Sequence, residues 1–355
     1  MQTIFHYRVS SLSVQRKEIR MNNHGDNFES PSRINVQIVV RPGLVVRWKQ
    51  FQYYPPFSIA LDGYCYGPTR FSRDGLRINL NHHEGVSDVA VRATCGQART
   101  LVKQQLFADF RDENGPRATL YANDCDQDVC LASFLFMYPD LVGRRLLRQL
   151  VAIEDFLDSS GGLYRPDNDE RRELMRMQAW IFEPYTDARL GGVLKSLKGD
   201  AMLEIINGVH ERIRLYLYGR GEQKTDFDIR YEVLSKFDVW SLVREVGTEA
   251  KTGMVTDGIR AYMTYLGELG GRHHYALGRL NPVVPFPVRQ ILECLNQAEG
   301  IRSNDVDRWG GGSNRGGSPR INGSSLAPDE AETVVEECVR RWTAKNRSLL
   351  RRRKS

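Results

Sequence analysis

Phe57-Ser58-Ile59-Ala60-Leu61-Asp62 is a short apolar run that ends in a carboxylate, and we predict that it forms a buried strand. A second run, Leu76 to Leu80, is followed by Asn81-His82-His83. A third run, Ala118 to Ala122, is followed by Asn123-Asp124-Cys125-Asp126-Gln127-Asp128. Ligands of open α/β sheets bind at the carboxyl ends of the strands. The sequence therefore predicts that these polar side chains lie at one edge of a sheet.

Helical patterns alternate with these strands. Thr94-Cys95-Gly96-Gln97 has the form of a capping box, with Thr94 as N-cap, and opens a predicted helix that ends near Phe107. Further helices are predicted over residues 128–136 and 140–158. Two short strands, interrupted at Arg41-Pro42-Gly43, precede them. The alternation favours an α/β fold with a mostly parallel sheet and flanking helices.

The chain of 355 residues is longer than one hydrophobic core usually supports, so several domains are expected. Residues 166–266 have mainly amphipathic, helical patterns, and strand-like and proline-rich segments return after them. We divide the chain as follows: 1–33, a disordered N-terminal extension; 34–165, a metal-binding α/β domain; 166–266, a helical subdomain or insertion; 267–346, a smaller α/β domain; 347–355, a basic tail.

Composition excludes several classes of protein. No apolar run is long enough to cross a bilayer, and the first 20 residues lack the apolar core of a secretory signal, although Met21 is an equally good start. The six cysteines form no CxxC pair, which indicates reduced thiols in a cytoplasmic protein. The net charge of +6 is modest and does not by itself indicate nucleic-acid binding.

Histidines and carboxylates near each other can bind divalent cations. Mg²⁺ and Mn²⁺ prefer carboxylate oxygens, and imidazole adds a preference for Mn, Fe or Zn. Three aspartates within five positions, from Asp124 to Asp128, repel one another unless cations or donors offset their charge. A second interpretation is that Asp128 only caps a helix and that the other two are solvated turn residues. A chance His pair in a loop is also common, as His273-His274 shows.

The glycine-rich segment Gly310–Gly317 also has two interpretations. It lacks the Lys-Ser/Thr of a P-loop, but its backbone amides can approach a phosphate, and Arg315 and Arg320 add charged donors. A flexible linker explains the glycines equally well. Trp309 and Pro319 are unusual for a linker, which leaves a phosphate-binding role open.

Together these motifs resemble the DHH phosphoesterase superfamily, over residues 57–160 and 270–340. In that family an Asp-x-Asp motif, a lone Asp, a His-His motif and a later Asp bind two Mn²⁺ or Mg²⁺ ions. A smaller associated domain then holds the substrate with a glycine loop. The corresponding segments here are Asp124-Cys125-Asp126, Asp62-Gly63, Asn81-His82-His83 and Ile153-Glu154-Asp155, and for the glycine loop Gly310-Gly311-Gly312-Ser313 and Gly316-Gly317-Ser318-Pro319-Arg320.

The chain departs from the family pattern in three ways. The Asp-x-Asp motif follows the His-His motif, so the strands would be permuted. Asn81 replaces the acid that precedes the two histidines, and Ser313 or Ser318 stands where the glycine loop has a histidine.

The resemblance implies hydrolysis of a phosphate ester or phosphodiester by a two-metal mechanism. The substrate would be a small phosphorylated compound, a nucleotide or a short oligonucleotide, and no membrane partner is expected. The alternatives are a non-catalytic relative that binds a nucleotide or metal, and an interaction scaffold without a metal site. The implied residues are, for the two Mn²⁺ or Mg²⁺ ions, Asp62, His82, Asp124, Asp126 and Asp155; for catalysis, His82 and His83; for the substrate, Gly311, Gly312, Gly316, Gly317, Ser318 and Arg320.

Overall fold

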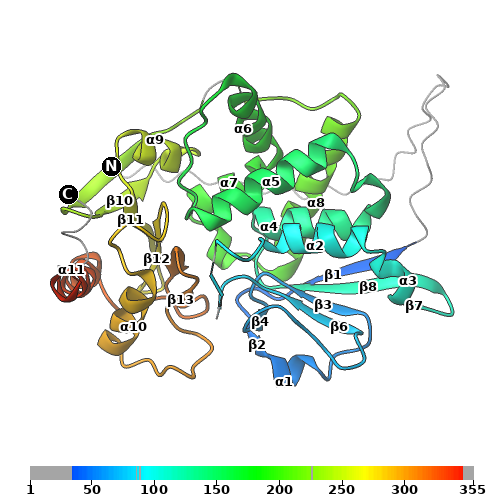
Figure 1. Ribbon diagram of the computed structural model, residues 1–355, viewed down its shortest axis with the longest axis horizontal. Helices are drawn as coiled ribbons and strands as arrows, with labels where there is room; N and C mark the ends of the chain where they lie inside the picture. Colours follow the sequence, from blue (N-terminus) through cyan, green and yellow to red (C-terminus); the bar gives the residue numbers. More distant parts are fainter. Residues whose placement is uncertain (1–33, 85, 88, 225–226, 347–355) are drawn as a thin grey trace, which may run out of the picture. The chain divides into compact units, whose positions relative to one another are not determined.

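The computed structural model describes residues 34–346 except 85, 88, 225 and 226 (Figure 1). These residues belong to one compact unit. The predictions for residues 1–33 and 347–355 lie outside the described residues. Within the described residues, no helix is long and apolar enough to span a membrane.

The first sheet contains the three strands that carry the polar motifs. β3 is paired in parallel with β6 on one side and with β8 on the other, and β8 is paired in parallel with β1. β5 and β7 are short and antiparallel to their neighbours. The carboxyl ends of β3, β6 and β8 therefore lie at one edge, as predicted. The strands are β1 (Asn35–Val40), β3 (Ser58–Leu61), β5 (Arg70–Phe71), β6 (Arg77–Leu80), β7 (Arg111–Asp112) and β8 (Gly115–Ala122).

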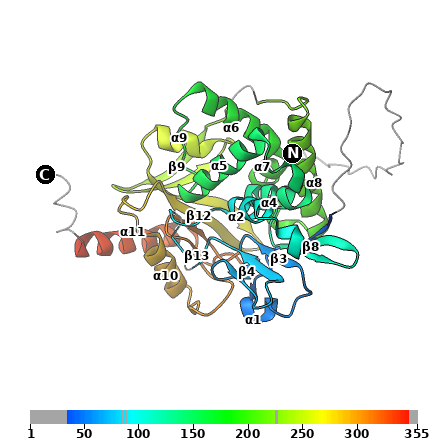
Figure 2. The same ribbon diagram turned by 45° about the vertical axis from the view of Figure 1, so that its right-hand side comes forward.

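Helices cover one face of this sheet in both ribbon views (Figures 1 and 2). They bury a core that includes Leu120 of the sheet, Phe134 of α4 and Leu150 of α5. The opposite face packs against α1 (Trp48–Phe51) and the small β2–β4 pair, Val46–Arg47 with Cys65–Tyr66. The other helical segments of this part are α2 (Thr94–Lys103), α3 (Leu106–Asp109), α4 (Gln127–Met137), η1 (Pro139–Leu141), α5 (Arg145–Ser159), α6 (Asp169–Ile181), α7 (Glu183–Leu190), η2 (Leu194–Ser196) and α8 (Gly199–Leu217).

A second sheet follows, in the order β13-β14-β12-β11-β10-β9. Only β10 and β11 are parallel in it, and the other pairs are antiparallel. A core built around Leu277, Leu295 and Val335 joins this sheet to α10 and α11. The elements are β9 (Tyr231–Lys236), β10 (Ser241–Glu245), α9 (Ala250–Thr256), β11 (Ala261–Leu269), β12 (Arg272–Arg279), α10 (Val288–Ala298), β13 (Gly310–Gly311), β14 (Arg315–Gly317) and α11 (Pro328–Lys345).

Three sequence-based expectations are wrong. The fold is α/β, but both large sheets are mixed rather than mostly parallel. Residues 231–266, expected to be helical, form three strands around α9, because apolar and aromatic side chains here pair across strands such as β10 and β11. Thr94 is not an N-cap, since Ala93 holds that position and no side chain caps the helix.

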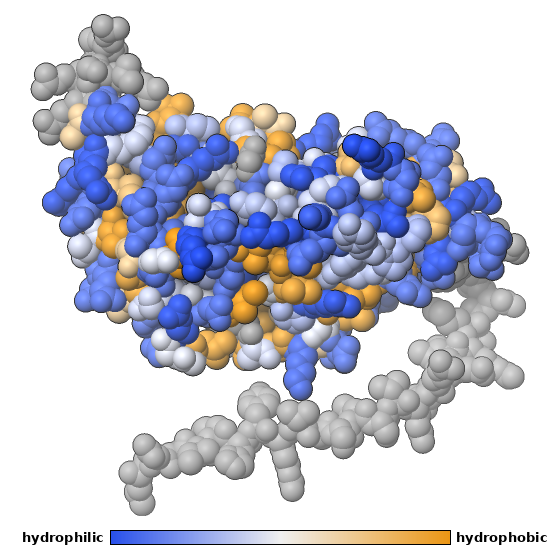
Figure 3. All heavy atoms as spheres, turned by 90° about the horizontal axis from the view of Figure 1, so that it is seen from below, coloured by the Kyte–Doolittle hydropathy of each residue, from blue (hydrophilic) through white to orange (hydrophobic). Residues whose placement is uncertain are grey.

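On the face shown in Figure 3, hydrophilic residues predominate and apolar residues lie between them. All six cysteines are free thiols in the structure.

One buried histidine makes the helical core sensitive to acid. Nε2 of His210 on α8 lies 2.9 Å from the Cys130 carbonyl oxygen, and burial lowers the pKa of His210 from 6.5 to about 4. The unfolded chain binds this proton more tightly, so stability present above pH 6.5 is lost as the pH falls toward 4. When the pH is lowered from 7 to 4.5, the unfolding free energy of both proteins falls. We expect the fall to be about 2 kcal/mol smaller for His210→Gln than for the wild type. Urea denaturation of both proteins at the two pH values measures this difference, and equal losses would contradict it.

Candidate metal centre

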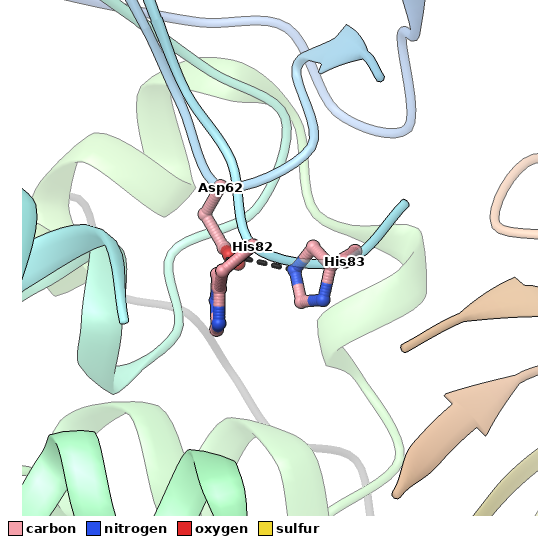
Figure 4. Close-up of side chains that lie close together, drawn as sticks. All are labelled: Asp62, His82 and His83. Carbon is pink, nitrogen blue, oxygen red and sulfur yellow. Dashed lines mark hydrogen bonds and ion pairs between the residues drawn. The ribbon is translucent and has the colours of Figure 1, made fainter. Parts of the chain in front are cut away.

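The turn after β3 places one carboxylate between two histidines. Asp62 has a positive φ of 41°, and its backbone N–H donates to the Leu80 carbonyl at the end of β6. Its Oδ1 lies 2.9 Å from Nε2 of His82 and 2.6 Å from Nε2 of His83 (Figure 4). The Asp62 side chain is almost completely buried. Both histidine rings therefore face the same carboxylate, although they are neighbours in sequence.

The same nitrogen of His82 also faces two further carboxylates. Nε2 lies 3.3 Å from Oδ2 of Asp128 and 3.4 Å from Oδ2 of Asp158. Asp128 is fixed because its oxygens accept hydrogen bonds from the backbone N–H groups of Thr94 and Cys95, at the start of α2. Asp158 lies in the last turn of α5. Two groups of three ligand atoms, Asp62-His82-His83 and His82-Asp128-Asp158, thus share His82.

The spacing of these atoms fits the coordination sphere of a cation. In an octahedral site with bonds of about 2.1 Å, neighbouring ligand atoms are about 3 Å apart. The distances of 2.6–3.4 Å around His82 and Asp62 match this spacing. Oδ2 of Asp158 is buried and has no hydrogen-bond partner, which an ion would supply. Carboxylate and imidazole donors together suit Mn²⁺ or another first-row divalent metal.

The protonation of the two histidines differs because their surroundings differ. Burial and Arg315 lower the pKa of His82, but the carboxylates of Asp158, Asp128 and Asp62 outweigh them and raise it to about 10. Burial lowers the pKa of His83 to about 3 despite the neighbouring Asp62. In the metal-free protein, the proton on His82 therefore neutralises part of the negative charge of the surrounding carboxylates. A bound metal ion would neutralise the same charge.

The remaining predicted ligands lie around these two groups. Asp124 and Asp126 line the same cavity. Oδ1 of Asp126 caps α4 through the Val129 N–H, and burial together with Asp62 raises the pKa of Asp126 well above its ordinary value. Asp155 accepts a hydrogen bond from the Ala93 N–H and, like Asp124 and Asp126, belongs to neither ligand group.

Sequence reasoning missed two of the carboxylates in the ligand groups. The sequence also allows Asp128 to be a simple helix cap, and it places Asp158 at the end of a predicted helix. The available signal for Asp128 was its place in the alternating Asp124-Asp126-Asp128 series. For Asp158 it was the unfavourable position of a carboxylate at a helix C-terminus, which a cation would offset.

A cavity of about 560 Å³ connects these acids to the glycine-rich segment. Of the predicted substrate-binding residues, Gly311, Gly316, Gly317, Ser318 and Arg320 line the cavity, whereas Gly312 does not. The glycines allow β13 and β14 to pair closely, since a Cβ on Gly311 would lie 2.3 Å from the Arg315 carbonyl oxygen. The segment is therefore an ordered hairpin and not a flexible linker.

Two arginines of this segment reach the acidic cluster. Arg315 on β14 forms an ion pair with Asp158, and one of its nitrogens lies 2.9 Å from Nε2 of His82. Arg320 donates to Oδ1 of Asn123 at 3.1 Å, and its other terminal nitrogen lies 3.5 Å from Nε2 of His83. The cavity thus has a wall of acids that includes the His83 imidazole and, beside it, two guanidinium groups.

Comparisons with protein families, curated proteins and solved structures found no match to this chain.

Proposed function

We propose that this protein is a divalent-metal-dependent phosphoesterase that hydrolyses a phosphate ester or phosphodiester. The observation that carries the proposal is the convergence of Asp62, Asp128 and Asp158 on His82, with Arg315 beside them. An acidic site suits a cation, and an adjacent guanidinium suits an anion, so the arrangement favours an anionic substrate bound through metal. The resemblance of the motifs to the DHH phosphoesterases supports the same proposal.

The residues have separate roles in this proposal. The residues of the two ligand groups would hold the cations, and because Nε2 of His82 has a single lone pair, His82 would bind only one of them. Bound cations supply a water of lowered pKa and polarise the phosphoryl oxygens. Arg315 and Arg320 would bind non-reacting phosphate oxygens and stabilise the negative charge of the transition state. His83 is neutral because of its lowered pKa, so it is suited to act as an imidazole ligand.

Adding metal tests the proposal directly. We expect metal-stripped protein to bind about two Mn²⁺ per chain and then to hydrolyse bis(4-nitrophenyl) phosphate, with EDTA abolishing the activity. The melting temperature should also rise, because a bound cation offsets the repulsion among the buried carboxylates. Calorimetric titration with Mn²⁺ and the release of 4-nitrophenol measure the two effects.

Two variants make this experiment specific. Asp158→Asn removes one carboxylate of a ligand group, whereas Asp109→Asn removes an exposed carboxylate on α3. We expect only Asp158→Asn to weaken Mn²⁺ binding and hydrolysis. Absence of both binding and hydrolysis in the wild-type protein would overturn the proposed function.

A further inference from the structure

The cavity has a second charged end, built from residues that the metal centre does not use. Arg189 of α7, Glu245 of β10 and Lys251 of α9 all line it, together with Tyr185 and Glu249. None of these five residues belongs to the two metal-ligand groups. They come from α7, β10 and α9 and the residues next to them. None of these elements contributes a carboxylate to the metal-ligand groups.

Of the two basic side chains at this end, Arg189 is paired with a carboxylate of the described residues and Lys251 is not. Arg189 forms an ion pair with Glu245 at 2.6 Å, and Thr264 donates to the other oxygen of Glu245 at 3.3 Å. Lys251, in contrast, forms no ion pair within 4 Å with any carboxylate in the described part of the chain. Its Nζ lies 5.6 Å from the centre of the Tyr262 ring. A phenol ring offsets an ammonium charge only in part, so Lys251 can still bind an anion.

The two carboxylates here do not cancel the positive charge. The pKa of Glu245 is lowered to about 2, against the effect of burial, mainly by Arg189 and then by Lys251, so Glu245 is ionised and committed to Arg189. Burial raises the pKa of Glu249 to about 7, so this carboxyl is partly protonated near neutral pH. Two cations face one full negative charge and one partial one, which leaves the end of the cavity positive.

The chain limits how far this end can lie from Asp158. A Cβ on Gly162, which has a φ of +75°, would lie 2.9 Å from Nζ of Lys251, so the amine lies directly against this glycine. Tyr262 holds the same turn by donating to the Gly161 carbonyl oxygen at 2.5 Å. Gly162 follows Asp158 by four residues, which span at most about 14 Å. A compact molecule can therefore reach both ends of the cavity.

We propose that Lys251, with Arg189 beside it, forms a second anion-binding subsite, and that the substrate is a compact phosphate ester with a second anionic group, a phosphate or a carboxylate. The part about the substrate rests on the proposed function. The subsite itself does not, because it binds the anion through the positively charged side chains of Lys251 and Arg189. Its occupant therefore does not need metal.

Anion binding to the metal-free protein tests the subsite. In the presence of EDTA, we expect the wild-type protein to bind orthophosphate and Lys251→Met to bind it at least about tenfold more weakly. Lys236→Met, which removes an exposed lysine on β9, is the matched control and should bind as the wild type does. Isothermal titration calorimetry measures the three affinities, and titration with acetate distinguishes a carboxylate site from a phosphate site.

The outcomes separate this inference from the proposed function. Equal orthophosphate affinity in the wild type, Lys251→Met and Lys236→Met overturns the subsite, whether or not the protein hydrolyses phosphate esters. Loss of binding in Arg320→Gln but not in Lys251→Met would place the anion at the glycine-rich hairpin and would also overturn it. If hydrolysis is found, Lys251→Met should lower kcat/KM more for 2-phosphoglycolate than for 2-hydroxyethyl phosphate, which lacks the second anionic group. Equal losses for the two would remove the part of the proposal that concerns the substrate.

Discussion

Asp62→Asn is expected to reduce Mn²⁺-dependent hydrolysis by at least about 100-fold. This loss is larger than the one usually seen when a residue that only hydrogen-bonds to a metal ligand is replaced. Oδ1 of Asp62 faces both histidines, so this one atom orients two imidazoles. Asparagine keeps the size of the side chain but removes the charge, and its amide nitrogen cannot bind a cation. The loss should appear in kcat and in the amount of Mn²⁺ bound per chain.

The fold of this variant must be checked separately, because Asp62 is buried at a strained backbone position. Against the effect of burial, the contacts of Asp62 with His83 and His82 hold its pKa well below the ordinary value, so the carboxylate is ionised in the native protein. Circular dichroism and the melting temperature without metal establish whether Asp62→Asn is folded. A folded variant with wild-type hydrolysis would show that Asp62 is not a metal ligand.

The sequence predicted the part of the site that depends on strand ends. Asp62 and His82 each follow an apolar run, and parallel pairing of β3 with β6 brings them together. The helices predicted over residues 128–136 and 140–158 also correspond to α4 and α5. These features depend on local patterns, which a single sequence contains.

The rest depends on tertiary contacts that a local pattern does not contain. Asp155 and Asp158 are three residues apart on one helix, and nothing local shows that Asp155 faces the Ala93 amide while Asp158 faces His82. The segment of β9 to β11 forms strands and not the expected helices, because pairing within the second sheet overrides its helical spacing. The sequence offers Arg315 as a charged donor near the glycines, but its ion pair with Asp158 joins residues 157 positions apart.

Arg315→Gln is expected to bind Mn²⁺ more tightly and to hydrolyse phosphate esters more slowly. The Arg315 guanidinium lies 2.9 Å from Nε2 of His82 and forms an ion pair with Asp158. Its positive charge is therefore close to two ligands and would repel a cation bound by them. Two like charges about 4 Å apart repel by roughly 4 kcal/mol at an effective dielectric constant near 20. Even a fraction of that repulsion, about 1.4 kcal/mol, corresponds to a tenfold gain in Mn²⁺ affinity.

The same substitution removes a donor from the substrate phosphate. Loss of one donor that stabilises transition-state charge typically costs about 100-fold in kcat. Arg315→Lys is the matched control: it keeps the positive charge but loses the planar fork that binds two phosphate oxygens at once. We therefore expect Arg315→Lys to keep Mn²⁺ affinity close to that of the wild type while still losing turnover. If Arg315→Gln left both Mn²⁺ affinity and kcat unchanged, Arg315 would only connect β14 to α5, and the anion would bind elsewhere in the cavity.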